Sequence, residues 1–187
     1  MAQKIIAEER IFDEVKKAIV NALGVDAESI KPESILTMDL DAESLDFLDI
    51  SYNLEQTFGF KMARHFVLEH AEEMFGEGSA IDENGCLPPQ AVEMLKLRFN
   101  GDRTSLEPGM DMDEVVHLIT VDSMAGSVLD ILDSLPETCP ECGRSSWKTE
   151  DGTHILCGSC RADAVYKTGD ELVIDWLKQV QEKEHLF

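Results

Sequence analysis

The sequence predicts a mainly α-helical protein that ends in a small β domain. Three observations support this fold class. Apolar residues recur at intervals of three and four along much of residues 8–132, which is typical of amphipathic helices. Two Cys-x-x-Cys pairs follow, at residues 139–142 and 157–160. Short segments of β type, separated by an Asp-Gly turn, lie between the two pairs.

The composition narrows the classes of function. The chain has 187 residues, of which 43% are hydrophobic, so we expect a globular protein. Its formal net charge of −22 is spread along the whole chain, which disfavours nucleic acid and anionic lipid as partners and favours basic protein surfaces. Solubility is the alternative reason for this charge. We expect no membrane span and, because no signal-peptide core is visible, a cytoplasmic protein.

The helices are predicted from apolar spacing. The first covers residues 8–23, where apolar residues repeat every fourth position, and the second covers residues 44–58. Later helices are expected over 63–77 and 89–99, then a short one from Asp111 through Leu118 and a last one that Thr120 caps. The second helix has a broad apolar face, which consists of Leu45, Leu48, Ile50, Tyr52, Leu54 and Phe58.

The clearest boundary is Leu135-Pro136, which gives two predicted domains. Residues 1–135 form a helical domain with an insertion at about 63–117, and residues 136–187 form the small β domain. Within that domain we expect a hairpin between the cysteine pairs, a third strand at 164–166 and a closing strand or helix over 172–181.

Ser44 opens the second predicted helix and follows the acidic stretch Asp39-Leu40-Asp41-Ala42-Glu43. A hydroxyl in this position is exposed and held by a firm backbone. The free N–H groups and the positive end of the helix dipole suit a bound phosphate ester. An ordinary helix N-cap is the alternative interpretation of Ser44.

Residues 44–58, with the sequence SLDFLDISYNLEQTF, resemble the second helix of the acyl carrier protein family, and Leu40 and Ala42 match its approach loop. The resemblance implies that Ser44 receives 4′-phosphopantetheine from a phosphopantetheinyl transferase. The protein would then carry acyl thioesters between enzymes of fatty-acid, lipid or polyketide synthesis and would not itself be an enzyme. Basic surfaces of these partners would dock on the acidic residues Glu43, Asp46, Asp49 and Glu55.

Three features depart from the family pattern. Asp41 stands where the family usually has glycine, Glu43 stands where it has aspartate, and the approach loop is one residue longer. Aspartate tolerates a positive φ better than most residues, and Glu43 keeps the carboxylate. These departures narrow which transferase or partner recognises the site. An unmodified carrier-like adaptor is the first alternative function.

The insertion resembles the extended region of specialised carriers over residues 85–132, including carriers of very long acyl chains for lipid A. Extra helices with many methionines could enlarge an acyl pocket, although core packing is the alternative role for those methionines. His65 and His70 are five residues apart on a predicted helix, a spacing that does not place them on one face for a metal. We expect no special role for them, for His117 or for Cys86.

The four paired cysteines, Cys139, Cys142, Cys157 and Cys160, have metal-ligand spacing, with 14 residues between the pairs. Two knuckles joined by a hairpin supply four thiolates for a tetrahedral site. The pattern resembles a zinc ribbon with a closed, structural zinc. A rubredoxin-like iron centre, and hence a redox protein, is the alternative, because Cys-Pro-x-Cys-Gly also suits iron. The scarcity of basic residues argues against nucleic-acid binding.

Overall fold

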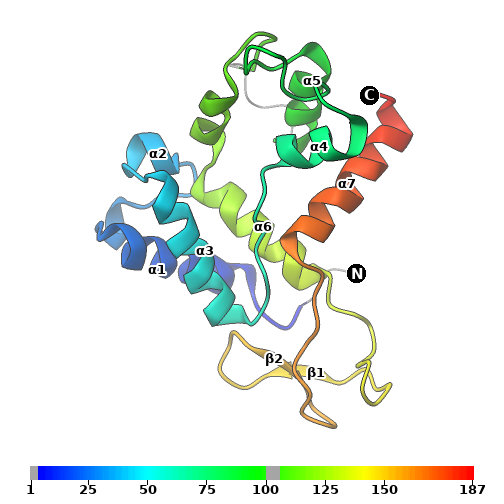
Figure 1. The fold of residues 1–187 in the computed structure, drawn as a ribbon. Helices are drawn as coiled ribbons and strands as arrows, with labels where there is room; N and C mark the ends of the chain where they lie inside the picture. Colours follow the sequence, from blue (N-terminus) through cyan, green and yellow to red (C-terminus); the bar gives the residue numbers. More distant parts are fainter. Residues whose placement is uncertain (1–3, 100–105) are drawn as a thin grey trace. The chain divides into compact units, whose positions relative to one another are not determined.

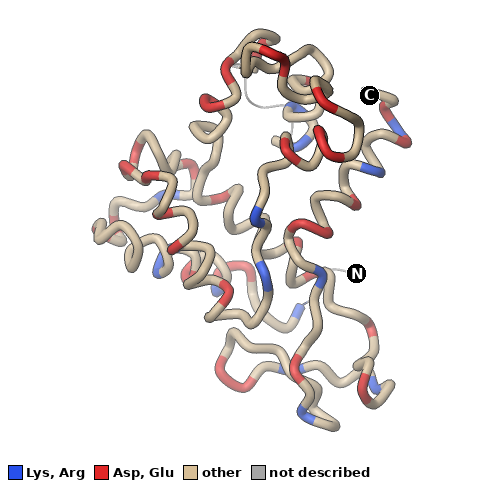
Figure 2. Tube along the Cα trace, viewed as in Figure 1, with Lys and Arg blue, Asp and Glu red and all other residues tan. Residues whose placement is uncertain are grey.

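A computed structural model describes residues 4–99 and 106–187. The protein is mostly helical, with one small antiparallel sheet of two strands in the described part, as Figure 1 shows. The predicted fold class is thus confirmed. None of the helices in these ranges is long and apolar enough to cross a membrane. Acidic residues are distributed along nearly the whole described trace (Figure 2).

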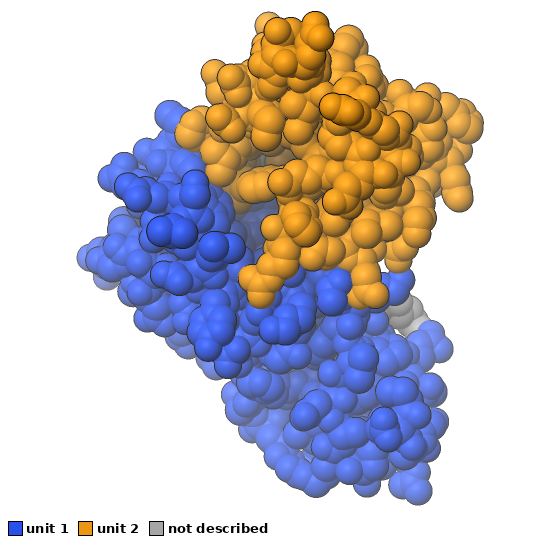
Figure 3. Space-filling model, in the orientation of Figure 1, with its two compact units in different colours: residues 1–62, 120–169 blue, residues 63–119, 170–187 orange. Residues whose placement is uncertain are grey.

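The chain forms two compact units (Figure 3). The first contains residues 1–62 and 120–169, and the second contains residues 63–119 and 170–187. The predicted boundary between residues 135 and 136 does not coincide with this grouping. The cysteine-rich segment groups with the carrier-like helices, and the last helix of the chain groups with the inserted segment.

The first unit is organised by three helices: α1 (Glu8–Leu23), α3 (Ser44–Phe58) and α6 (Val121–Asp133). Helix α1 contacts both α3 and α6. Their shared core includes side chains that are fully buried, which are Val15, Ile19, Ile50, Leu54, Val128 and Leu132. Removing this apolar surface from water is the main driving force for the packing. The predicted bounds of the first two helices agree closely with the structure.

The connection from α1 to α3 is a long loop that contains two short helical turns, η1 (Ala27–Ser29) and α2 (Leu36–Asp39). Buried apolar side chains of Ile30, Leu36 and Leu40 fix the loop to the core. The backbone also pairs with the beginning of α6, because Ser34 O accepts a hydrogen bond from Val121 N at 3.0 Å. The approach to Ser44 is therefore held in place although it lacks regular structure.

The predicted hairpin is present in the first unit. Strand β1 (Trp147–Thr149) pairs antiparallel with β2 (Ile155–Cys157), in the register Trp147 to Cys157. The predicted third strand at 164–166 is wrong: beside β2 the chain forms an isolated bridge between Leu156 and Asp163, and Ala164 N donates to Ile155 O at 3.0 Å. The ring of Tyr166 packs edge-on against Phe60 at 6.3 Å between centroids, so this region contacts the chain just after α3.

The second unit contains α4 (Val67–Phe75), α5 (Pro89–Arg98), the turn η2 (Met112–Leu118) and α7 (Gly169–Glu184). Its core draws on the inserted segment and on α7, which contributes Val173 and Leu177. The last residue, Phe187, stacks on Phe75 with ring centroids 4.4 Å apart. The C-terminal segment was predicted as strand or helix, and it is a helix that completes the core of the insertion.

Candidate prosthetic-group site and metal centre

Ser44 is the first residue of α3, and its side chain is exposed. The preceding residue, Glu43, has the extended backbone of an N-cap, with φ −97° and ψ 169°. Its N–H donates to Asp46 Oδ2 at 2.7 Å, which closes the first turn. Glu43 therefore occupies the N-cap position that the alternative interpretation gave to Ser44. Within the described residues, no hydrogen bond engages the Ser44 hydroxyl.

The approach loop aims the serine outward. Leu40 and Ala42 are buried on either side of Asp41, which is exposed. Asp41 has a φ of 55°, in the left-handed region that glycine adopts most easily. Aspartate is among the residues that tolerate this conformation, so Asp41 fits the loop although the residue departs from the family pattern. The Ala42 N–H then donates to Leu36 O at 3.0 Å.

Helix α3 has a buried face and an exposed apolar stripe. Ile50, Leu54 and Phe58, spaced four residues apart, are buried against α1 and the core. The rest of the broad apolar face predicted from sequence points to solvent: Leu45 is 74% exposed and Tyr52 is 58% exposed. Leu48 is also exposed and lies between them. Periodicity alone could not choose between the stripes, because both have helical spacing.

One predicted docking residue is corrected by its burial. The Glu55 side chain is 1% exposed, so a partner surface cannot reach it. Its carboxylate accepts hydrogen bonds from Met62 N at 3.0 Å and from Lys61 Nζ at 3.1 Å, and it anchors the chain that leaves α3. Glu43 and Asp49 are exposed and Asp46 is half-buried. These three carboxylates remain candidates for docking beside the exposed apolar stripe.

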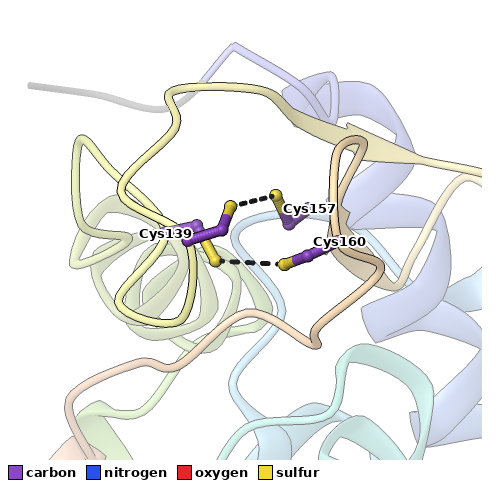
Figure 4. Close-up of side chains that lie close together, drawn as sticks. Cys139, Cys157 and Cys160 are labelled. Atoms are coloured by element: carbon purple, nitrogen blue, oxygen red, sulfur yellow. Dashed lines mark hydrogen bonds between the residues drawn. The ribbon is translucent and has the colours of Figure 1, made fainter.

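The four paired cysteines converge in the first unit (Figure 4). Cys139 Sγ lies 3.7 Å from Cys160 Sγ, and Cys142 Sγ lies 3.6 Å from Cys157 Sγ. All four sulfur atoms lie within 4.8 Å of one another. A tetrahedral metal with bonds of about 2.3 Å to sulfur separates its ligands by about 3.8 Å. The sulfur atoms are thus close enough to hold a metal, and their spacing fits a tetrahedral one.

The two Cys-x-x-Cys turns, at residues 139–142 and 157–160, have the same backbone hydrogen bond. In the first, Gly143 N donates to Cys139 O, and in the second, Arg161 N donates to Cys157 O, both at 2.8 Å. Gly143 and Arg161 both have left-handed backbones, with φ of 70° and 65°. Gly158 has a different role. A Cβ there would lie 2.9 Å from a backbone oxygen, so only glycine allows this close approach.

The electrostatics of the cluster also fit a cation. The hydroxyl of Ser146 and the backbone N–H of Cys160 favour the thiolate of Cys157 and lower its pKa to about 5. At Cys160, a backbone hydrogen bond from Ala162 favours the thiolate. Partial removal from water and the neighbouring sulfur atoms outweigh it and raise the pKa of Cys160 to about 12. Four adjacent thiolates need a compensating positive charge, which a divalent metal would supply.

The structure also places the lone cysteine and two of the histidines that the sequence analysis considered. Cys86 is half-buried. Partial removal from water raises the pKa of its thiol, and the carboxylates of Asp82 and Asp111 raise it further, so it is a poor nucleophile. His65 and His70, predicted to lie on different faces, come together because His65 precedes α4 and is not part of it. The spacing of two histidines five residues apart misleads when the helix begins between them.

Comparison with known proteins identifies the class of the Ser44 domain. Residues 13–72 match the family described as "Phosphopantetheine attachment site". The chain is 39% identical over 72 residues to the acyl carrier protein AcpXL of Rhizobium meliloti, which covers 38% of this chain and 72% of that protein. It is 40% identical over 55 residues to the acyl carrier protein of Coprothermobacter proteolyticus, which covers 29% and 67% of the two chains.

The chain therefore belongs to the acyl carrier protein family. A further relative is the acyl carrier protein of a Picosynechococcus species, with 46% identity over 50 residues. That match covers 27% of this chain and 62% of the relative, so the chain spans less than two thirds of that protein's length. No solved structure matches the chain significantly. The resemblance found in the sequence around Ser44 is confirmed at the level of the family.

Proposed function

We propose that Ser44 carries 4′-phosphopantetheine and that the protein holds acyl groups as thioesters on that arm. The observation that carries this proposal is the position of Ser44, exposed at the first residue of α3 with a separate residue as N-cap. The N-terminal end of a helix and the positive end of its dipole favour a negatively charged phosphodiester there. The protein's own side chains then supply presentation, and the thiol of the arm supplies the chemistry.

The partners we propose are a phosphopantetheinyl transferase and acyl-processing enzymes of fatty-acid, lipid or polyketide synthesis. Glu43, Asp46 and Asp49 offer negative charge near the serine, and Leu45 and Leu48 offer exposed apolar surface on the same helix. A basic partner surface with an apolar centre would complement this combination. Charge would speed the encounter, and the apolar contacts would supply most of the affinity.

The inserted segment does not by itself argue for a larger acyl pocket. Met94 is fully buried in the core of the second unit, and Met74, Met110 and Met112 pack against that core. These methionines fill space within the unit. A long or unusual acyl cargo therefore rests on the resemblance of the insertion to specialised carriers, and mass spectrometry of the acyl group carried in cells would identify it.

The test of the carrier function is intact-mass measurement after co-expression with a phosphopantetheinyl transferase. We expect the wild-type protein to gain the mass of phosphopantetheine. Ser44→Ala should gain nothing, while Ser51→Ala, which removes another hydroxyl from the same helix, should be modified like the wild type. Absence of modification with several transferases would overturn the proposal and favour the unmodified adaptor.

We also propose that the four cysteines hold a structural zinc. The support is the tetrahedral spacing of the sulfur atoms and the absence of an open position in a site made of four cysteines. Elemental analysis of the purified protein should find zinc that denaturation with a thiol-blocking reagent releases. A red protein that contains iron and absorbs visible light would instead indicate the rubredoxin-like alternative.

A further inference from the structure

Three metal-type ligands converge in the second unit, away from the serine and the cysteines in sequence. His70 Nε2 lies 2.9 Å from Asp170 Oδ1, and His65 Nδ1 lies 3.9 Å from the same oxygen. One ligand atom of each residue lies within 4.8 Å of the others. We propose that His65, His70 and Asp170 form a second metal site, which binds Zn²⁺ or a chemically similar divalent cation.

The distances are close to those of a loaded site. Zinc bonds to nitrogen and carboxylate oxygen are about 2.0–2.2 Å, so tetrahedral ligands lie about 3.3–3.5 Å apart. The separations of the Asp170 oxygen from the two imidazole nitrogens, 2.9 and 3.9 Å, lie on either side of this value. Shifts of about 0.5 Å, within the reach of ordinary side-chain rotation, would bring the atoms to the metal. The His65 side chain is 57% exposed, so an ion can enter from solvent.

The carboxylate of Asp170 is already held in place. It accepts hydrogen bonds from the backbone N–H groups of Arg64 at 3.0 Å and His65 at 3.2 Å. An aspartate carboxylate is ionised at neutral pH, which is the form that binds metals.

The buried ring of His70 has an unused nitrogen. His70 is 4% exposed, and its Nδ1 has no hydrogen-bond partner among the described residues. A metal on Nε2 would place the ring proton on Nδ1. The nearest carboxylate oxygen, Glu73 Oε2, lies 3.9 Å away on a side chain that is 71% exposed and free to rotate. Metal-bound histidines usually donate their second N–H to such a carboxylate.

The ligand types select the metal. Two imidazoles and one carboxylate suit Zn²⁺ and similar ions, whereas Mg²⁺ and Ca²⁺ prefer sites made of oxygen alone. The pair His70 and Asp170 is separated by 100 residues in sequence, so an ion here would tie the beginning of α4 to the beginning of α7. Three protein ligands leave one position for water, unlike the closed site of four cysteines.

The test is a calorimetric titration of the full chain with Zn²⁺, after removal of any affinity tag and saturation of the cysteine site with zinc. We expect one further equivalent of Zn²⁺ to bind, and excess Mg²⁺ not to compete. His65→Gln should weaken this binding more than about tenfold, since even residues that only support a ligand commonly change affinity by about 10–100-fold. His185→Gln, the same change at an exposed histidine outside the cluster, should bind like the wild type.

Nuclear magnetic resonance of the imidazole nitrogens gives a direct second measurement. Signals of two histidines should shift on addition of Zn²⁺ in the wild type, and Asp170→Asn should reduce the effect. Circular dichroism checks that each variant is folded, and His65→Gln decides the result if Asp170→Asn unfolds. The proposal is overturned if the wild type binds no zinc beyond the cysteine site, or if His65→Gln binds as tightly as the wild type.

Discussion

One matched pair of substitutions, Leu54→Ala and Leu48→Ala, distinguishes the roles of the buried and exposed faces of α3. Leu54 is completely buried, while Leu48 is 52% exposed. Replacing leucine by alanine removes three carbon groups, and each buried group contributes about 0.8 kcal/mol. The loss of hydrophobic stabilisation at Leu54 is therefore about 2.4 kcal/mol. The cavity left behind brings the loss of unfolding free energy into the range of about 3–4 kcal/mol.

The assay is urea unfolding at equilibrium, followed by far-ultraviolet circular dichroism. With a slope of about 1–3 kcal/mol per molar urea, Leu54→Ala should lower the midpoint by about 1–4 M. Leu48→Ala should change the unfolding free energy by less than about 1 kcal/mol, but it should slow modification of Ser44 by the transferase. Equal destabilisation by the two variants would refute the assignment of the buried and exposed faces.

Two further predictions concern local backbone and charge. At Asp41, with φ of 55°, glycine should be nearly neutral, within about 1 kcal/mol, whereas Asp41→Val should cost more than about 1 kcal/mol in urea unfolding. Burial raises the pKa of Glu72, but hydrogen bonds from the N–H groups of Ala80, Ile81 and Gly78 outweigh it and lower the pKa below 4.5. Its stabilising effect is thus present above pH 4.5 and is lost as pH falls. Glu72→Gln should cost about 1–3 kcal/mol at neutral pH and progressively less in acid, measured by unfolding at several pH values.

Sequence patterns correctly placed Ser44 at the start of a helix, grouped the four cysteines and bounded the main helices, because each of these depends on local spacing. The segment from Ser44 to Phe58 has the helix bounds that periodicity gave it. The exposure of the apolar stripe with Leu45 and Leu48 could not be predicted in this way, because burial depends on which neighbours cover a helix. Neighbours come from distant parts of the chain, and one sequence does not reveal them.

The remaining errors have the same physical origin. Glu55 lies on a face of α3 that looked polar, and it is buried because the chain after the helix folds back to donate hydrogen bonds to it. His65 and His70 meet because the chain before α4 is bent and because Asp170 arrives from another helix. A contact between residues 100 positions apart leaves no periodic signal in sequence.

The two ends of α3 have different roles. The beginning presents Ser44 to solvent, and the Glu43–Asp46 turn and the buried Leu40 and Ala42 of the approach loop hold the backbone there. The end is braced: Phe58 stacks on Phe60 with centroids 5.5 Å apart, and Phe60 meets Tyr166 of the cysteine-rich segment. A metal that orders this segment would therefore stiffen the helix at the end away from the serine. Such an arrangement keeps the presented end open to partner enzymes while the helix that positions it remains fixed.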